Sequence, residues 1–225
     1  SSDLWTAGGA RFVAHAEPFE RLKLRMVNGS HSALAYLGAM AGFRTVDRAM
    51  AEPALRAFID ALMREEIAPT LPAMEGLDLD GYRARLLERF SNPALRHQTK
   101  QIAMDGSQKL PQRLLGTVRD RLAAGLPIDR LALAVAGWVH YLRGVDETGA
   151  AHEIQDPLAS ELARRLARAN AASSMQDRVA FFTGFAPVFG ELGGEPRFVA
   201  AVAQQLGVLE TQGVRGALAA STASA

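Results

Sequence analysis

The chain has 225 residues, of which 48% are hydrophobic, and its 25 lysines and arginines nearly balance its 24 aspartates and glutamates. This composition can build a buried core, which excludes a disordered chain, and the interspersed charges exclude an electrostatic footprint for nucleic acid or an anionic membrane. Cysteine is absent, so disulfides, thiolate zinc sites and cysteine nucleophiles are excluded as well. The uncharged runs fall far short of the roughly 20 apolar residues that span a bilayer, and we expect a cytoplasmic protein.

Residues 1–17 are predicted to form a linker or a residual strand at a domain boundary, because they contain two adjacent glycines and only one short apolar alternation. Residues 18–225 are predicted to form a helical domain, because prolines at first-turn positions are followed by apolar residues at spacings of three and four. After a first helix we expect helices over 53–74, 79–90, 94–103, 111–124, 130–142, 158–171, 175–182 and 196–206. The alanine-rich residues 217–225 are expected to fray. No series of strands separates the helices, so the predicted fold class is all-α.

Three phosphate-binding and catalytic motifs are absent from the sequence. It contains no G-x-G-x-x-G after a strand, no Walker-type lysine loop and no G-x-S-x-G. Chemistry that depends on a nucleotide cofactor would therefore need a cofactor site outside these residues.

The most informative stretch is residues 17–38. On an α-helix of about 100° per residue with Lys23 at 0°, Glu20 lies at about 60°, His31 at about 80° and Asn28 at about 140°. All four side chains therefore share one arc. Apolar residues surround this arc, which predicts a largely buried segment: Leu22, Met26, Leu34 and Leu37.

Oxidation of an alcohol without a metal would use this set of side chains. A desolvated lysine has a lowered pKa, so Lys23 is a candidate base for the hydroxyl proton. Asn28 and His31 are candidates to bind the developing alkoxide, and Glu20 to pass the proton to solvent. On spacing alone, a helix that carries one snorkelling lysine and a satisfied core histidine is the commoner structure.

The spacing Lys23-x4-Asn28-x2-His31, within KLRMVNGSHSALAYLG, resembles the signature of the polyol-specific long-chain dehydrogenases, among them mannitol 2-dehydrogenases and fructuronate reductases. RTVDRAM, RFSNPALRHQTKQIAMDGSQKLPQRLL and YLRGVDETG follow in the family's order, so the resemblance covers about residues 17–166. It implies a helical C-terminal substrate domain of the 6-phosphogluconate-dehydrogenase-like type. An N-terminal Rossmann domain of the same polypeptide would hold NAD, with the active site in the cleft between the domains and without zinc.

The resemblance also implies roles for single residues. It makes Lys23 the general base, Asn28 and His31 the partners of the reacting oxygen, and Glu20 an acid near the proton exit. Lys109 resembles a lysine that contacts a distal hydroxyl or carboxylate of the substrate. Gln101 stands eight residues earlier, where we expect an arginine in members that oxidise mannitol. This difference leaves two substrate pairs, mannitol with fructose and mannonate with fructuronate.

Several other features receive structural interpretations. Arg96, His97 and Lys100 are interpreted as a solvated basic face. The acidic residues and His152 between 146 and 156 lie in a glycine-containing loop, so we expect no metal site there. Gly29 within the motif indicates a close approach of substrate or of another backbone.

Two alternatives to a catalytic domain fit the same sequence. One is a non-catalytic helical domain for oligomerisation or protein binding, and the other is an isolated domain retained from a truncated dehydrogenase. We expect these 225 residues alone to be inactive, since they carry no nucleotide-binding motif.

Overall fold

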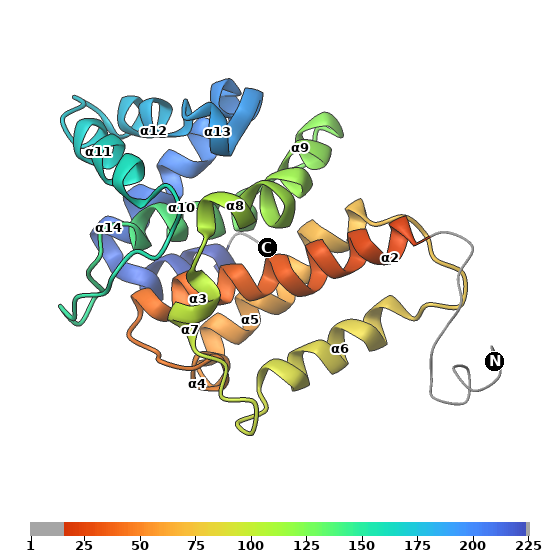
Figure 1. Cartoon of the computed structure of the whole chain (residues 1–225). Helices are drawn as coiled ribbons and strands as arrows, with labels where there is room; N and C mark the ends of the chain where they lie inside the picture. Colours follow the sequence, from red (N-terminus) through yellow and green to blue (C-terminus); the bar gives the residue numbers. More distant parts are fainter. Residues whose placement is uncertain (1–15, 224–225) are drawn as a thin grey trace.

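The computed structural model describes residues 16–223, and within them every regular element is a helix (Figure 1). Extended residues pair only in two isolated antiparallel bridges of this described part, Thr45 with Gln98 and Val145 with Ala151. The predicted all-α fold class is confirmed. Residues 1–15 of the predicted linker lie outside the described residues, and the first helix among the described residues begins at Glu17. No helix within 16–223 combines the length and the apolar character needed to cross a membrane.

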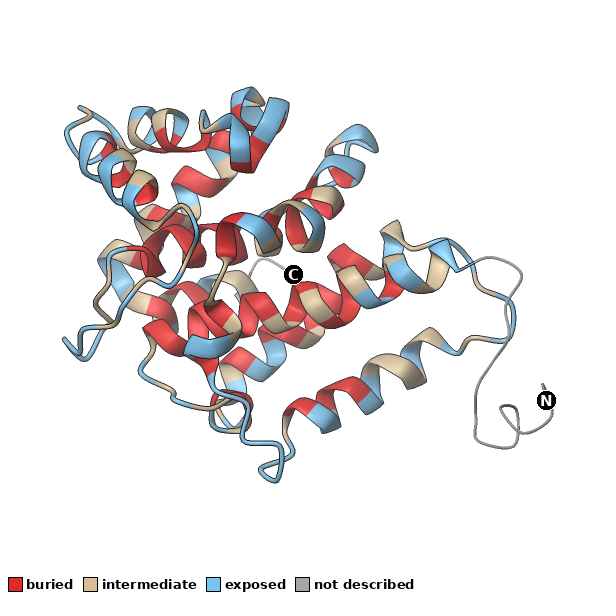
Figure 2. Cartoon of the chain, in the orientation of Figure 1, coloured by how far each residue is buried: buried red, intermediate tan, exposed pale blue. Residues whose placement is uncertain are grey.

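The central element is one continuous helix in three parts. It consists of α2 (Glu17–Leu22), the π-helical η1 (Lys23–Gly29) and α3 (Ser30–Met40). All residues of α3 except His31 are buried, because α3 packs against α10 (Asp129–Tyr141) and α7 (Thr99–Ala103) in the middle of the bundle (Figure 2). This continuous helix over residues 17–40, called the motif helix below because it carries Lys23, Asn28 and His31, therefore forms part of the hydrophobic core.

The other elements surround this helix. In Figure 1, α6 runs as a separate arm below it, and α11 to α13 form a second layer that contacts the long α14. The bounds of the elements before α7 are α4 (Val46–Met50), α5 (Pro53–Ala61), η2 (Leu62–Ile67), η3 (Ala68–Thr70) and α6 (Leu79–Phe90). Those of the remaining elements are α8 (Gly106–Leu110), η4 (Pro111–Leu115), α9 (Gly116–Ala123), α11 (Ala159–Ala169), α12 (Met175–Thr183), α13 (Ala186–Phe189), η5 (Gly190–Gly194) and α14 (Pro196–Ala223).

The predicted helix over 94–103 is wrong in its first half, since α7 begins only at Thr99. The Asn92 side chain accepts a hydrogen bond from the Ala94 amide, and Arg96 has a φ of 46°. The main chain is then paired with residues 44–46, because the Val46 amide donates to the His97 carbonyl. These bonds satisfy the backbone outside a helix.

The expectation that residues 217–225 fray is wrong for their described part, because α14 extends to Ala223. Gly213, with a φ of 71°, interrupts the helix, and the Glu147 carboxylate accepts a hydrogen bond from the Val214 amide at 2.6 Å. This contact satisfies a free amide at the restart of the helix. Ala217 and Leu218 are buried, so packing stabilises the alanine-rich end.

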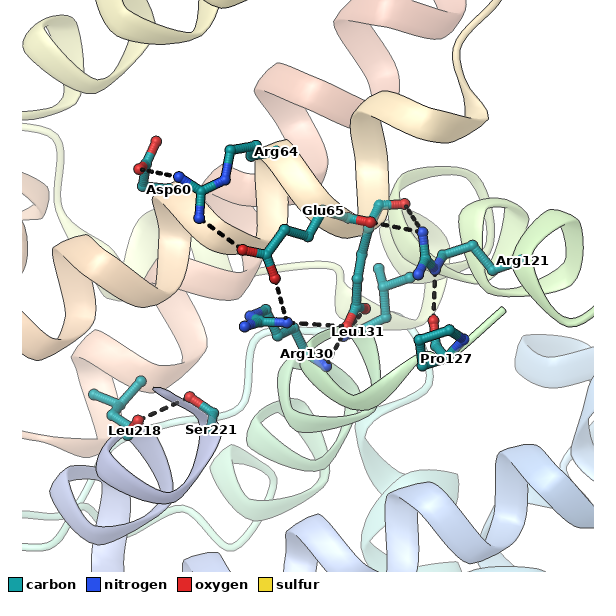
Figure 3. A network of polar contacts seen from close by, with 10 residues as sticks. Asp60, Arg64, Glu65, Arg121, Pro127, Arg130, Leu131, Leu218 and Ser221 are labelled. Atoms are coloured by element: carbon teal, nitrogen blue, oxygen red, sulfur yellow. Dashed lines mark hydrogen bonds and ion pairs between the residues drawn. The ribbon is translucent and has the colours of Figure 1, made fainter. Parts of the chain in front are cut away.

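A polar network joins η2, α9 and the start of α10 (Figure 3). The Glu66 carboxylate accepts hydrogen bonds from the Arg130 and Leu131 amides, both at 2.8 Å. Arg121 donates to the carbonyls of Glu65 and Pro127. These hydrogen bonds hold η2, α9 and the start of α10 together.

Candidate active site

The π-helical turn changes the relation between Lys23 and Asn28. A π-helix bonds residue i to residue i+5, so side chains five positions apart lie nearly one turn apart on the same face. An α-helix would separate them by about 140°. His31 follows Asn28 by three residues, at the start of α3, and stays on that face. The continuous helix thus presents Lys23, Asn28 and His31 in one direction.

The predicted burial of this set is wrong for two of its members. Lys23 and Glu20 are exposed, whereas Asn28 and His31 are half-buried. The other faces of η1 are buried in the bundle, but no element of residues 16–223 covers the side that carries Lys23. Within the same residues the Asn28 amide has no hydrogen-bond partner, which leaves its donor and acceptor available for a ligand.

His31 is held by neighbouring rings. Its imidazole stacks on Phe90 at a centroid distance of 4.9 Å and an interplanar angle of 13°, and the His97 ring lies 5.7 Å away. Burial, together with the charges of His97, Arg113, Arg89 and Lys109, lowers the pKa of His31 to about 4. His31 is therefore neutral near pH 7, and its Nε2 is buried without a partner among the described residues. A neutral imidazole with a free nitrogen can bind a substrate oxygen.

Lys109 and Arg113 approach His31 from a second helix, formed by α8, η4 and α9. The Lys109 Nζ lies 3.8 Å from the Asp105 carboxylate and donates to the Ile102 carbonyl at 3.4 Å. The Arg113 guanidinium donates to the Ser32 hydroxyl at 3.0 Å. Burial lowers the pKa of both groups, and the charge of Arg113 lowers that of Lys109 further. The structure thus places Lys109 and Arg113 near enough to His31 for their charges to act on its ring, while the substrate contact of Lys109 stays a prediction.

Gly29 lies at the crossing of the two helices. A Cβ atom at this position would be 2.6 Å from the Arg113 carbonyl oxygen. The predicted close approach is confirmed, and it is an approach of another backbone. Since η1 and η4 are both π-helical, two widened turns meet at this point.

The remaining predicted positions have different surroundings. Gln101 is exposed on α7, and its side chain forms no hydrogen bond within residues 16–223. Arg96 and Lys100 are exposed, as a solvated basic face requires. His97 is exposed too, but its ring contact with His31 makes it part of the candidate site. Arg113 could have been found from its spacing, since it follows Lys109 by four residues on one helix face.

The acidic loop between 146 and 156 has structural roles. The Asp156 carboxylate accepts hydrogen bonds from the Ser107 amide and hydroxyl at the start of α8. The His152 ring stacks on Tyr141 at 4.3 Å. Among the described residues, no group of three or more histidine, aspartate or glutamate side chains is placed to hold a metal ion.

Comparison with known proteins identifies the family. The mannitol dehydrogenase C-terminal domain family matches residues 15–210. The chain is 48% identical to the D-mannonate oxidoreductase of Escherichia coli K12 over 217 residues, which cover 96% of this chain and 44% of that protein. It is 37% identical to the mannitol 2-dehydrogenase of Phaeosphaeria nodorum over 208 residues, which cover 92% of this chain and 35% of that protein.

A solved structure has the same fold. The chain superposes with a TM-score of 0.90 on the mannitol 2-dehydrogenase of Pseudomonas fluorescens, solved as a ternary complex with NAD and D-mannitol. The two are 34% identical, and the match covers 98% of this chain and 44% of that one. The chain therefore spans less than half the length of these relatives. The resemblance inferred from the sequence is confirmed, and the chain belongs to the mannitol dehydrogenase C-terminal domain family.

Proposed function

We propose that this chain is the substrate domain of an NAD-dependent dehydrogenase that interconverts a polyol or aldonate with a ketose or ketouronate. Mannitol with fructose and mannonate with fructuronate are the two leading pairs. One observation carries the proposal. A single helix face presents the Lys23 amine together with the Asn28 amide and the His31 Nε2, neither of which has a hydrogen-bond partner within residues 16–223. The names of the relatives and the NAD in the Pseudomonas complex support it.

The side chains of this face have separate tasks in the proposed reaction. Lys23 takes the proton of the substrate hydroxyl, and Glu20, one turn earlier and exposed, passes it to solvent. Asn28 and neutral His31 hydrogen-bond the oxygen as its negative charge develops. Lys109 holds a distal group of the substrate.

NAD, when bound, supplies the acceptor for the hydride that leaves the carbinol carbon. The residues of this chain fit the substrate side of that reaction, because their free polar atoms suit a hydroxyl oxygen and the sequence has no glycine-rich phosphate cradle. We therefore assign NAD to an N-terminal Rossmann domain of the same polypeptide. That domain would also cover the exposed side of η1 and remove water from Lys23, which an amine needs in order to act as a base near neutral pH.

A non-catalytic helical domain would leave the main features of the site without a purpose. Oligomerisation does not require an orphaned imidazole nitrogen beside a cluster of cations. The catalytic interpretation accounts for both.

The test is an assay of the polypeptide that carries this chain together with its nucleotide-binding domain. NAD reduction is followed with mannitol, arabinitol, mannonate and altronate. We expect Lys23→Ala to lower turnover by about 10²- to 10⁴-fold, because proton transfer in the transition state is lost. Lys100→Ala is the matched control, since it removes an exposed lysine of α7, and it should leave turnover unchanged. Undiminished turnover of Lys23→Ala, or NAD-linked turnover by these 225 residues alone, would contradict the proposal.

A further inference from the structure

Arg113 is a half-buried cation without an anionic partner in the part of the chain that the structure describes. Within residues 16–223 its guanidinium makes a single hydrogen bond, to the neutral hydroxyl of Ser32, and it forms no salt bridge. A guanidinium has five N–H donors and stays charged, so partial burial without an acceptor for them is unfavourable.

Other poorly exposed arginines of the described chain do have such partners. Arg121 donates to three backbone carbonyls, and Arg165 donates to two. Four more are paired with carboxylates: Arg83 with Asp60, Arg25 with Asp120 at 2.6 Å, Arg130 with Glu65 at 2.8 Å and Arg178 with Glu210 at 2.7 Å. Arg113 departs from this pattern at the candidate active site.

The groups near Arg113 make the site more positive. The charges of Arg113, Lys109, Arg89 and His97 all act on the His31 ring. Asp105 pairs with Lys109, but at 3.8 Å and with half of its side chain exposed. The Asp156 carboxylate also acts on Lys109, so an anion that bound here would meet the charges of Arg113, Lys109 and Arg89 against those of two carboxylates.

Arg113 is also positioned by the motif helix. Its carbonyl abuts Gly29, next to Asn28, and its guanidinium binds Ser32, next to His31. The charge is thus held near His31, on whose ring it acts. A planar carboxylate offers two negatively charged oxygens that match the paired donors of a guanidinium, whereas a hydroxymethyl group offers one uncharged oxygen.

We propose that Arg113, together with Lys109, binds the carboxylate of a sugar acid and makes the enzyme select aldonates over polyols. This inference rests on the proposed function and adds a residue that determines specificity. Of the two leading substrate pairs, it favours mannonate with fructuronate over mannitol with fructose.

The test compares mannonate with mannitol, which share a carbon skeleton and differ in the carboxylate. In the full polypeptide, Arg113→Gln should lower kcat/KM for mannonate by about 10- to 100-fold, mainly through KM, because charge-assisted hydrogen bonds are lost. For mannitol the change should stay within about 3-fold, since no carboxylate is present. An equal loss with both substrates would overturn the inference while the proposed function stands.

Two controls separate charge from structure. Ser32→Ala removes the hydrogen bond of Arg113 but keeps its charge, so the preference for mannonate should persist. Arg119→Gln removes an exposed arginine of α9 and should leave kcat/KM unchanged for both substrates. If Ser32→Ala reproduces the effect of Arg113→Gln, the role of Arg113 is structural and the inference fails.

Thermal unfolding of the full polypeptide without NAD gives a readout independent of turnover. Mannonate should raise the Tm of the wild type and leave that of Arg113→Gln unchanged, and mannitol should raise neither. A shift with mannitol 1-phosphate in place of mannonate would overturn the choice of a carboxylate. Absence of turnover with every substrate, together with the mannonate shift, would refute the proposed function and leave the anion site intact.

Discussion

Gly29 is the residue on which the geometry of the site depends most directly. It lets the backbones of η1 and η4 meet, so that Asn28 and His31 lie on one helix and Arg113 lies beside them on the other. A Cβ atom at this position would be 2.6 Å from a carbonyl oxygen, which is part of a helix backbone and cannot rotate away. Glycine is therefore required here by packing between two backbones.

Replacement of Gly29 by alanine should destabilise the protein by about 1–3 kcal/mol, because the two helices must separate. The displacement of Asn28 should lower turnover as well. Gly116→Ala is the control, because the nearest atom to its added methyl group is 3.7 Å away, and it should stabilise the helix by about 0.5–1 kcal/mol. Urea unfolding measures both changes. Equal free energies of unfolding for the two variants would refute this role of Gly29.

The start of α10 is capped by a side chain from a different element. Glu66, on η2, is 2% exposed, and its two carboxylate oxygens accept from the Arg130 and Leu131 amides. Burial raises the pKa of Glu66, while these two bonds and the charges of Arg121 and Arg130 oppose that rise. Two backbone amides at the N-terminus of α10, which have no acceptor within their own helix, thereby find one on a neighbouring helix.

Glu66→Ala should lower the free energy of unfolding by about 3 kcal/mol, because the Arg130 and Leu131 amides lose their acceptor and the Arg130 guanidinium loses a carboxylate 3.9 Å away. Glu65→Ala, one position earlier on η2, should cost less than about 1 kcal/mol, since the Glu65 side chain is 32% exposed and Arg130, its partner at 2.8 Å, keeps the Glu66 carboxylate at 3.9 Å. Denaturant unfolding of the two variants provides the comparison. If both cost the same, the cap does not stabilise α10 in this way.

At the scale of the whole molecule, α10 is the hub against which α3 and α14 pack, and a histidine is buried at its C-terminal end. His140 is 3% exposed and lies near Arg143, Arg178 and Glu210. Burial lowers its pKa to about 4, and the positive charge of Arg143 acts in the same direction. The native state therefore keeps His140 neutral at a pH where the unfolded chain protonates it.

The free energy of unfolding should consequently fall as the pH drops from about 6.5 to about 4, because the unfolded chain binds more protons in that window. We expect the wild type to lose on the order of 1–2 kcal/mol more than His140→Gln between pH 7 and pH 5. His31, whose pKa is lowered similarly, contributes equally to both proteins and cancels in the difference. Urea unfolding at the two pH values is the measurement, and identical losses would show that His140 is not the group responsible.

Local sequence signals determined the fold class, several helix boundaries and the family. The helix over 79–90 agrees with α6, since Asp78 caps its first turn and its apolar residues recur at helical spacing. The predicted helix over 175–182 agrees within one residue with α12, which Ser174 caps. Lys23, Asn28 and His31 were identified from one short motif, because a few turns of a single helix carry all three.

Contacts between residues far apart in the chain decided the rest. The π-helical turn at Lys23–Gly29 is visible only in the tertiary structure, where η1 packs against η4. The folded bundle also brings Arg113, His97 and Phe90 close to His31, although they are far from it in the sequence. The exposure of Lys23 and the extension of α14 to Ala223 likewise depend on which surfaces other elements cover. Periodicity and capping act within a turn or two of helix, whereas close approach, burial and clustered charge arise only when distant segments pack together.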